Sequence, residues 1–205
     1  LLRGKKRPLL MSGGGTLYAS AMQEVREFAE TFGIPVAETQ AGKSALPWDH
    51  PLNVGAIGVT GSLAANLLAK EADVIIGVGT RYSDFTTASK SAFAHPDVQF
   101  VNINISHMDS SKWDGVALTC DAKLGLRALA DALSAGGCIS GYEPGAIEAL
   151  KRRWDEEVDH LYGVELNEGL AQVRALGVIQ DTIASDAVIV CAAGSLPGDL
   201  HRLWR

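Results

Sequence analysis

The sequence lacks any run of about 18 or more apolar residues, the length that a membrane-spanning helix needs, and its first seven residues lack the apolar stretch of a secretory signal. Basic residues are also scarce. The formal net charge is -6, and the one basic cluster is Lys5-Lys6-Arg7. Nucleic-acid surfaces need clustered Lys and Arg to displace counterions. We therefore expect a cytoplasmic protein that binds small molecules or proteins, with no nucleic acid and no membrane as partner.

Cysteine is nearly absent too. Cys120, Cys138 and Cys191 are widely spaced and form no C-x-x-C pair, so neither a disulfide framework nor a zinc site is predicted. We interpret all three as buried thiols. The five histidines fall on separate segments without ligand-like spacing, so no metal site is predicted.

Hydrophobic residues make up 47% of the 205 residues, enough for one full domain and part of a second. Short apolar runs alternate with segments of helical spacing, which predicts an α/β fold with a doubly wound parallel sheet. The predicted strands are 7–12, 33–39, 73–79, 98–105 and 116–121, and the predicted helices are 17–32, 60–72, 122–133 with Asp121 as N-cap, and 146–163.

A change of composition divides the chain. After Leu133 the sequence becomes rich in Gly and Ser, which favours a domain boundary. We predict a first domain at 1–135, a linker and charged helix at 136–165, and the truncated start of a second α/β domain at 166–205. In that last part a helix leads into an apolar segment, DAVIVCAAG, which we interpret as a buried strand.

Gly13-Gly14-Gly15 stands between a predicted strand and a predicted helix. Such a turn exposes N–H groups at the positive end of a helix, where a phosphate is favoured. The triplet matches neither G-x-G-x-x-G nor a P-loop, so a tight turn without a ligand is an equal alternative.

Two loops carry further candidates. Residues 41–62 form a long segment that we interpret as irregular, and its Lys43, Trp48, Asp49 and His50 either bind a ligand or cover another domain. Arg81 follows a predicted strand, at the edge where open α/β sheets bind ligands. It either holds a phosphate or carboxylate, or pairs with Asp84 on the surface.

Residues 7–39, 41–90 and 100–123 together resemble the central domain of thiamine-diphosphate-dependent enzymes of the acetolactate synthase type. Within that family, AGKSALPWDHPLNVGAIGVTG, GTRYSDFTTASK and AAGSLPGDLHRLWR are similar to the branch that opens the ring of a cyclic 1,2-dione in myo-inositol catabolism. The resemblance covers essentially the whole chain. It implies a Rossmann-like central domain followed by the truncated start of the diphosphate-binding domain.

The resemblance also implies cofactors and partners. Family members place a pyrimidine-binding domain before the central domain and a diphosphate-binding domain after it, so the missing N- and C-terminal domains are the expected partners within a homo-oligomer. An N-terminal glutamate activates thiamine diphosphate, and a G-D-G motif with a later Asn holds Mg²⁺; neither lies in this sequence. The full-length parent is thus expected to be a C–C bond hydrolase, and this fragment to be inactive.

Site residues follow from matched positions. GSLPGD stands where relatives have a loop beside the cofactor diphosphate, which implies that Gly194, Ser195 and Leu196 are near the cofactor, with His201 as a further candidate. Flavin-containing relatives hold FAD with counterparts of Gly13, Gly14 and Arg81. Their two strand-end aspartates are Asn104 and Ser106 here. This departure argues against FAD, and we expect the fragment to bind no cofactor. The alternatives are an FAD- or NAD-binding module, or the central domain of a carboligase or decarboxylase.

Overall fold

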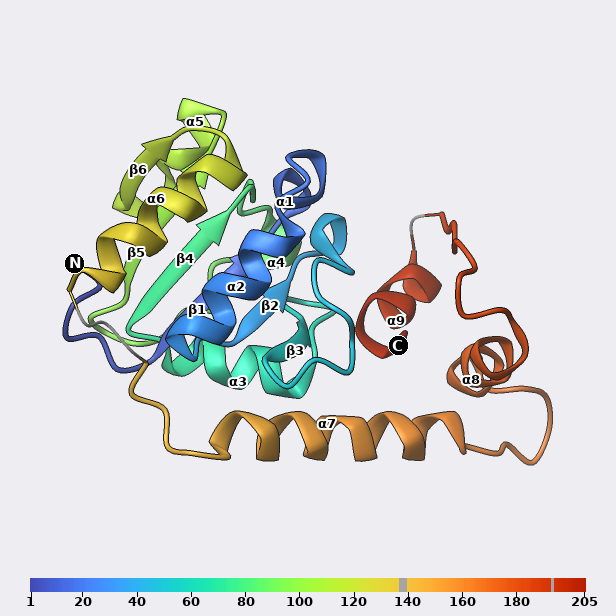
Figure 1. Ribbon diagram of the computed structural model, residues 1–205. Helices are drawn as coiled ribbons and strands as arrows, with labels where there is room; N and C mark the ends of the chain where they lie inside the picture. Colours follow the sequence, from blue (N-terminus) through green and yellow to red (C-terminus); the bar gives the residue numbers. More distant parts are fainter. Residues whose placement is uncertain (137–139, 193) are drawn as a thin grey trace.

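The computed structural model describes residues 1–136, 140–192 and 194–205. Its centre is a six-stranded, all-parallel sheet in the order β3-β2-β1-β4-β5-β6 (Figure 1). This is the strand order of a doubly wound, Rossmann-like sheet, so the predicted fold class is confirmed. The strands are β1 (Pro8–Ser12), β2 (Val36–Glu38), β3 (Asn53–Ala56), β4 (Val74–Val78), β5 (Gln99–Asn104) and β6 (Val116–Thr119).

Helices cover both faces of the sheet (Figure 1). On one face α2 (Met22–Phe32) and α6 (Ala122–Ser134) pack on side chains such as Leu10 of β1. On the other face α3 (Leu63–Glu71) packs on side chains such as Leu9. Successive residues of the central strands point to opposite faces, and both faces are buried. This explains the uninterrupted apolar runs of the sequence.

The first predicted helix is interrupted. The structure has α1 (Gly14–Tyr18) and α2 instead of one helix over 17–32. Ser20, with φ 51°, adopts a left-handed conformation between them. A helix cannot continue through such a residue. Asp121 caps α6 as predicted, because its carboxylate accepts a hydrogen bond from the Leu124 N–H at 3.1 Å.

Two strands differ from the prediction. The segment 41–62 is not irregular throughout, because it contains β3, which pairs in parallel with β2. The strand prediction at 116–121 places β6 correctly, but β6 is not buried: it is the edge strand beside β5, and Val116 is 47% exposed. The remaining short elements are η1 (Gln40–Gly42), α4 (Asp84–Thr87), α5 (His107–Ser110) and η2 (Lys112–Asp114).

The charged helix predicted at 146–163 is α7 (Ala146–Tyr162). It runs along α3 and β3 and then beyond the sheet toward α8 (Gln172–Thr182) (Figure 1). Its apolar stripe is divided between two clusters. Ile147, Leu150 and Trp154 pack on the core under α3, whereas Val158 packs on the last part of the chain.

The last part of the chain contains α8 and α9 (Ser195–Leu203), and the prediction of a buried strand there is wrong. Ala187–Ala192 has no regular structure, and Val188 and Val190 are 88% and 90% exposed. The segment pairs with no strand of the sheet among the described residues, so Val188 and Val190 are not covered as a buried strand would be. Instead, Leu176 and Leu203 bury themselves against Val158 of α7.

The thiol prediction was wrong in part. Cys191 is exposed, Cys120 is partly buried, and Cys138 lies outside the described residues. None of the helices in the described ranges is both long enough and apolar enough to span a bilayer.

Candidate functional site

The first candidate site is a cleft of about 720 Å³ at the carboxyl ends of β1, β4 and β5. Open α/β sheets bind ligands at this edge, where the strand order reverses. Gly14 and Arg81, two of the predicted site residues, line the cleft together with Thr80, Asn104 and Ser106. Its rim carries the exposed side chains of Tyr18 and Ile105, which are 94% and 81% accessible.

Gly13 lies behind the cleft wall, and its role in the structure is geometric. A Cβ added to Gly13 would lie 2.6 Å from Thr80 Cα, and one added to Gly15 would lie 2.6 Å from Gly79 Cα. The Gly13 N–H donates to Val78 O at 2.8 Å, and the Gly15 N–H donates to Gly79 O at 3.0 Å. Two of the three N–H groups are therefore already bonded to backbone carbonyls, and glycine is needed because two backbones touch.

Arg81 is exposed at the mouth of the cleft. Its backbone carbonyl accepts a hydrogen bond from Lys112 Nζ at 2.6 Å, which fixes the main chain. The Arg81 guanidinium itself has no hydrogen-bond or ion-pair partner among the described residues. The alternative of an ion pair with Asp84 is not found, because the Asp84 carboxylate accepts from Ser89 Oγ at 3.1 Å instead. The Arg81 side chain is thus free to meet an anion.

Asn104 and Ser106 stand where flavin-containing relatives are expected to have two carboxylates. Both form hydrogen bonds with nearby residues. Asn104 Nδ2 donates to Thr80 O at 2.8 Å, and Asn104 Oδ1 accepts from the Ser106 N–H at 2.9 Å. Ser106 caps α5 by accepting from the Asp109 N–H. Neither residue offers a carboxylate to a ribose hydroxyl.

Gly194, Ser195 and Leu196 form the exposed start of α9. Gly194 has φ 140°, a conformation that favours glycine, and no atom of the residues that the structure describes, its chain neighbours aside, lies within 4 Å of a Cβ built on it. The structure brings none of these residues into the cleft with Arg81. Their prediction as cofactor neighbours stays a prediction.

His201, the fourth predicted residue of the tail, is buried and 4% exposed. Its Nδ1 lies 2.9 Å from Thr60 Oγ1, while its Nε2 has no hydrogen-bond partner among the described residues. Burial, and next the charge of Lys43, lower the pKa of His201 to about 4, although the nearby backbone of Glu38 and Thr39 acts in the opposite sense. His201 therefore joins α9 to the sheet as a neutral side chain.

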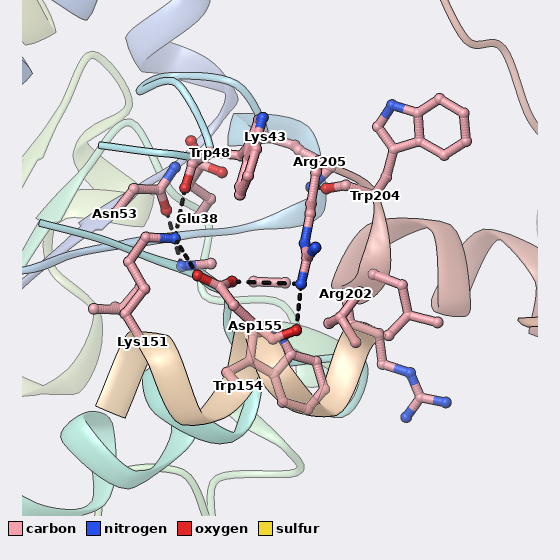
Figure 2. Close-up of a pocket in the computed structure, with 15 residues that line it drawn as sticks. Glu38, Lys43, Trp48, Asn53, Lys151, Trp154, Asp155, Arg202, Trp204 and Arg205 are labelled. Atoms are coloured by element: carbon pink, nitrogen blue, oxygen red, sulfur yellow. Dashed lines mark hydrogen bonds and ion pairs between the residues drawn. The ribbon is translucent and has the colours of Figure 1, made fainter. Parts of the chain in front are cut away.

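A second group of polar residues surrounds the carboxyl end of β2 (Figure 2). Glu38 is 3% exposed and accepts from the Leu46 N–H at 3.1 Å, and Asn53 Nδ2 donates to Leu46 O at 3.1 Å. Desolvation raises the pKa of Glu38 and lowers that of Lys43. Perturbed groups of this kind mark candidate binding sites.

Of this group, Lys43 and Trp48 were predicted as candidates from the sequence. Glu38, Asn53 and Arg205 were not predicted. A signal for Glu38 was present: a carboxylate directly at the end of the apolar run PVAE. His50 and Asp49 have other surroundings. His50 Nε2 lies 3.0 Å from Glu30 Oε1, and Asp49 is exposed.

Thiamine diphosphate with Mg²⁺ would need oxygen ligands for the metal. Within 1–136, 140–192 and 194–205, no group of three or more His, Cys, Asp or Glu residues gathers in an arrangement that could hold a metal ion. The turn at Gly194 can offer backbone N–H groups to a diphosphate. The described residues alone therefore do not make a complete site for this cofactor.

Comparison with known proteins supplies the family. Residues 1–129 match the model of the family described as "Thiamine pyrophosphate enzyme, central domain". Proteins named 3D-(3,5/4)-trihydroxycyclohexane-1,2-dione hydrolase are similar over the whole chain. The one from Clostridium perfringens (strain ATCC 13124) is 44% identical over 227 residues, and the one from Clostridium tetani is 42% identical over 228 residues. In both cases the match covers 100% of this chain and 35% of the relative, so this chain spans about a third of their length.

Proposed function

Since the chain belongs to the thiamine pyrophosphate enzyme family and carries its central domain, we propose that it is part of a hydrolase that opens the ring of trihydroxycyclohexane-1,2-dione to give 5-deoxyglucuronate in myo-inositol catabolism. The observation that supports this proposal is 44% identity to a protein of that name across all of this chain. Thiamine diphosphate would supply the carbanion chemistry by acting as an electron sink.

The part of this chain in that reaction is to support rather than to react. The six-stranded parallel sheet, with helices packed on both of its faces, supports this role as a scaffold for the other domains. We further propose that the parent works with Mg²⁺, as a cytoplasmic homo-oligomer, together with its other domains.

Activity assays with two proteins test this function. One protein is residues 1–205, and the other is the same chain joined to the parts of the Clostridium perfringens relative that lie outside the matched region. With thiamine diphosphate, Mg²⁺ and the cyclic dione, we expect ring opening by the joined protein and none by residues 1–205. A joined protein that folds, binds thiamine diphosphate and instead only decarboxylates or condenses 2-oxo acids would favour the carboligase alternative.

A nucleotide-binding module is the second candidate, because the cleft with Gly14 and Arg81 lies where doubly wound sheets bind dinucleotides. The bonded N–H groups of Gly13 and Gly15 and the loss of both carboxylates count against it. Thermal unfolding in the presence of FAD, NAD or ADP separates the two candidates, since a ligand that binds only the folded state raises the midpoint. We expect no rise at about 1 mM ligand, a concentration that would stabilise the folded state by about 1.4 kcal/mol for a Kd of about 0.1 mM. A saturable rise that Arg81→Met removes would establish the nucleotide site.

A further inference from the structure

A second cleft, of about 580 Å³, lies between the start of α2, the loop 43–48 and the last residues of the chain. Small-molecule sites commonly measure about 300–1,000 Å³, so this volume suits a compact ligand. Lys43, Arg26 and Arg205 line it, as do Trp48, Trp204 and the buried Glu38. It is distinct from the strand-end cleft that holds Gly14 and Arg81.

The charge of Lys43 is not neutralised by a fixed carboxylate. Lys43 Nζ donates to the carbonyl of Trp204 at 2.9 Å, and no carboxylate of the described residues lies within ion-pairing distance of it. Glu38 is the anionic side chain that acts on it most, but it forms no ion pair with Lys43. A mostly buried ammonium group is costly without an anionic partner.

Arg26 brings a second uncompensated cation to the same cleft. Its guanidinium makes no hydrogen bond or ion pair within the described part of the chain. Arg205 differs, because its charge is already satisfied on α7: Arg205 Nη1 lies 2.6 Å from Asp159 Oδ1, and its Nη2 donates to the Asp155 carbonyl (Figure 2). Lys43 and Arg26 therefore leave an excess of positive charge facing the cleft.

The walls of the cleft add an apolar component. The Trp48 ring lies 5.4 Å from Lys151 Nζ and 5.3 Å from the Arg205 guanidinium carbon, which holds the indole in place between α7 and the end of the chain. Figure 2 shows Trp48, Lys43 and Arg205 meeting above α7. The fixed indole of Trp48 next to cations without a carboxylate partner suits a ligand with an apolar or ring body and an anionic group.

We propose that this cleft binds a small organic anion, whose carboxylate or phosphate group is held by Lys43 and Arg26 and whose body lies against Trp48 and Trp204. A guanidinium and an ammonium group can share the oxygens of one anionic group, with Arg supplying the bidentate contact. The site joins α2 and the loop 43–48 of the sheet domain to Trp204 and Arg205 at the end of the chain.

Titration of residues 1–205 with benzoate, phenyl phosphate, inorganic phosphate and the neutral analogue benzyl alcohol tests the proposal. Tryptophan fluorescence and calorimetry report binding, because two of the four tryptophans line the cleft. We expect benzoate or phenyl phosphate to bind with a saturable curve and benzyl alcohol to bind at least tenfold more weakly. Whichever of benzoate and phenyl phosphate binds more tightly identifies the preferred anionic group. The affinity for inorganic phosphate measures how much of the binding free energy comes from the anionic group without an apolar body.

Two variants locate the site. Arg26→Met and Lys43→Met should each weaken anion binding about tenfold or more, the loss of one charge-assisted contact. Arg153→Met removes an exposed charge from α7 and should leave binding unchanged. Arg26 is at the surface of α2, so Arg26→Met is expected to fold even if Lys43→Met does not. Equal binding of benzyl alcohol and benzoate, or no effect of Arg26→Met, would overturn the proposal.

Proton uptake gives an independent readout. Desolvation lowers the pKa of Lys43, and an anion beside it must raise that pKa again. Binding at alkaline pH should then take up protons, so the calorimetric enthalpy should differ between buffers of different ionisation enthalpy. The difference should disappear in Lys43→Met and persist in Arg153→Met. An enthalpy independent of the buffer at every pH from 7 to about 10 would contradict the role of Lys43.

Discussion

His201 Nδ1 and Thr60 Oγ1 lie 2.9 Å apart and join residues separated by 141 positions in the sequence. Through this contact α9 is attached to the turn between β3 and α3. Gly198 of α9 also approaches Thr60, since a Cβ on Gly198 would lie 2.8 Å from Thr60 Cγ2. The end of the chain is thus packed on the sheet domain although the residues before it, Ala187–Ala192, are exposed.

The neutral state of His201 predicts a pH dependence of stability. Its pKa falls from 6.5 to about 4 on folding, so between these values the unfolded chain binds more protons than the folded chain. Stability is therefore complete above pH 6.5 and is lost as the pH falls toward 4, by at most about 3 kcal/mol. Urea unfolding from pH 4 to 8 should show this decline in the natural chain. His201→Gln should show a flatter profile over the same range, and an identical profile would contradict the role of His201.

Glu24 predicts a loss of stability at lower pH. It is 4% exposed, and its Oε1 lies 2.6 Å from Arg127 and 3.6 Å from Lys123, which ties α2 to α6. Burial acts to raise its pKa, but its backbone hydrogen bond and the two cations prevail and lower it below 4.5. Its contribution is present above pH 4.5 and is lost as the pH falls through the lowered value.

Glu24→Gln should therefore cost about 1 kcal/mol at pH 7 and less at pH 3, because the solvent-accessible cations of Arg127 and Lys123 lose their anionic partner only when Glu24 is ionised. Glu27→Gln is the matched control on the same helix. Glu27 is exposed, and among the described residues its carboxylate accepts only from Gln23, so its replacement should change the free energy of unfolding by less than about 0.5 kcal/mol. A cost for Glu24→Gln that does not change with pH would show that packing, not charge, is responsible.

We predict that alanine substitutions at the neighbouring residues Gly13 and Gly14 differ in their effect on stability. Gly13→Ala would place its Cβ against the backbone of Gly79 and Thr80, whereas Gly14→Ala would meet the Ala41 Cβ at 3.1 Å. We expect Gly13→Ala to lower the free energy of unfolding by about 1–3 kcal/mol or more, and Gly14→Ala to cost clearly less. Chemical unfolding of both variants measures the difference. If the glycines served only to approach a phosphate, neither variant would lose stability without ligand.

We predict that substitutions in the exposed apolar segment Ala187–Ala192 leave the stability of the protein almost unchanged. Val188 and Val190 make little contact with the rest of the chain, so Val188→Lys and Val190→Lys should change stability by less than about 0.5 kcal/mol. Amide hydrogen exchange should be fast over 187–192 and slower at the buried Leu176. Fast exchange across both regions alike would instead agree with a tail that does not pack on α7.

The fold could be predicted from the sequence because buried parallel strands give continuous apolar runs, as in VIIGV of β4. β3 escaped prediction because NVGA is short, contains Gly55 and follows Pro51, so it lacks a strand signal of its own and depends on pairing with β2. The opposite error occurred at 187–191, where AVIVC has the composition of a strand but no strand to pair with. Local propensity predicts a strand only when the tertiary structure offers an edge.

The candidate sites, like the strands, could be predicted from the sequence only in part. Gly14 and Arg81 could be found because the carboxyl edge of a parallel sheet is a known location for ligands. The joint environment of Glu38, Lys43 and Arg205 could not be found, because it combines β2, a loop and the end of the chain, and no spacing in the sequence reports that meeting. Burial of His201 had no sequence signal either, since only the docking of α9 removes it from water.

The anchoring of Arg205 has a practical consequence. Its guanidinium contacts α7, and its N–H donates to Gln180 Oε1 at 3.0 Å, so the backbone of the final residue is held beside Trp48 and Trp204. In the 205-residue chain, a dye or spin label attached after Arg205 would therefore lie beside the cleft without any substitution inside it. Such a reporter would respond both to ligand binding in the cleft and to detachment of α9, in one sample.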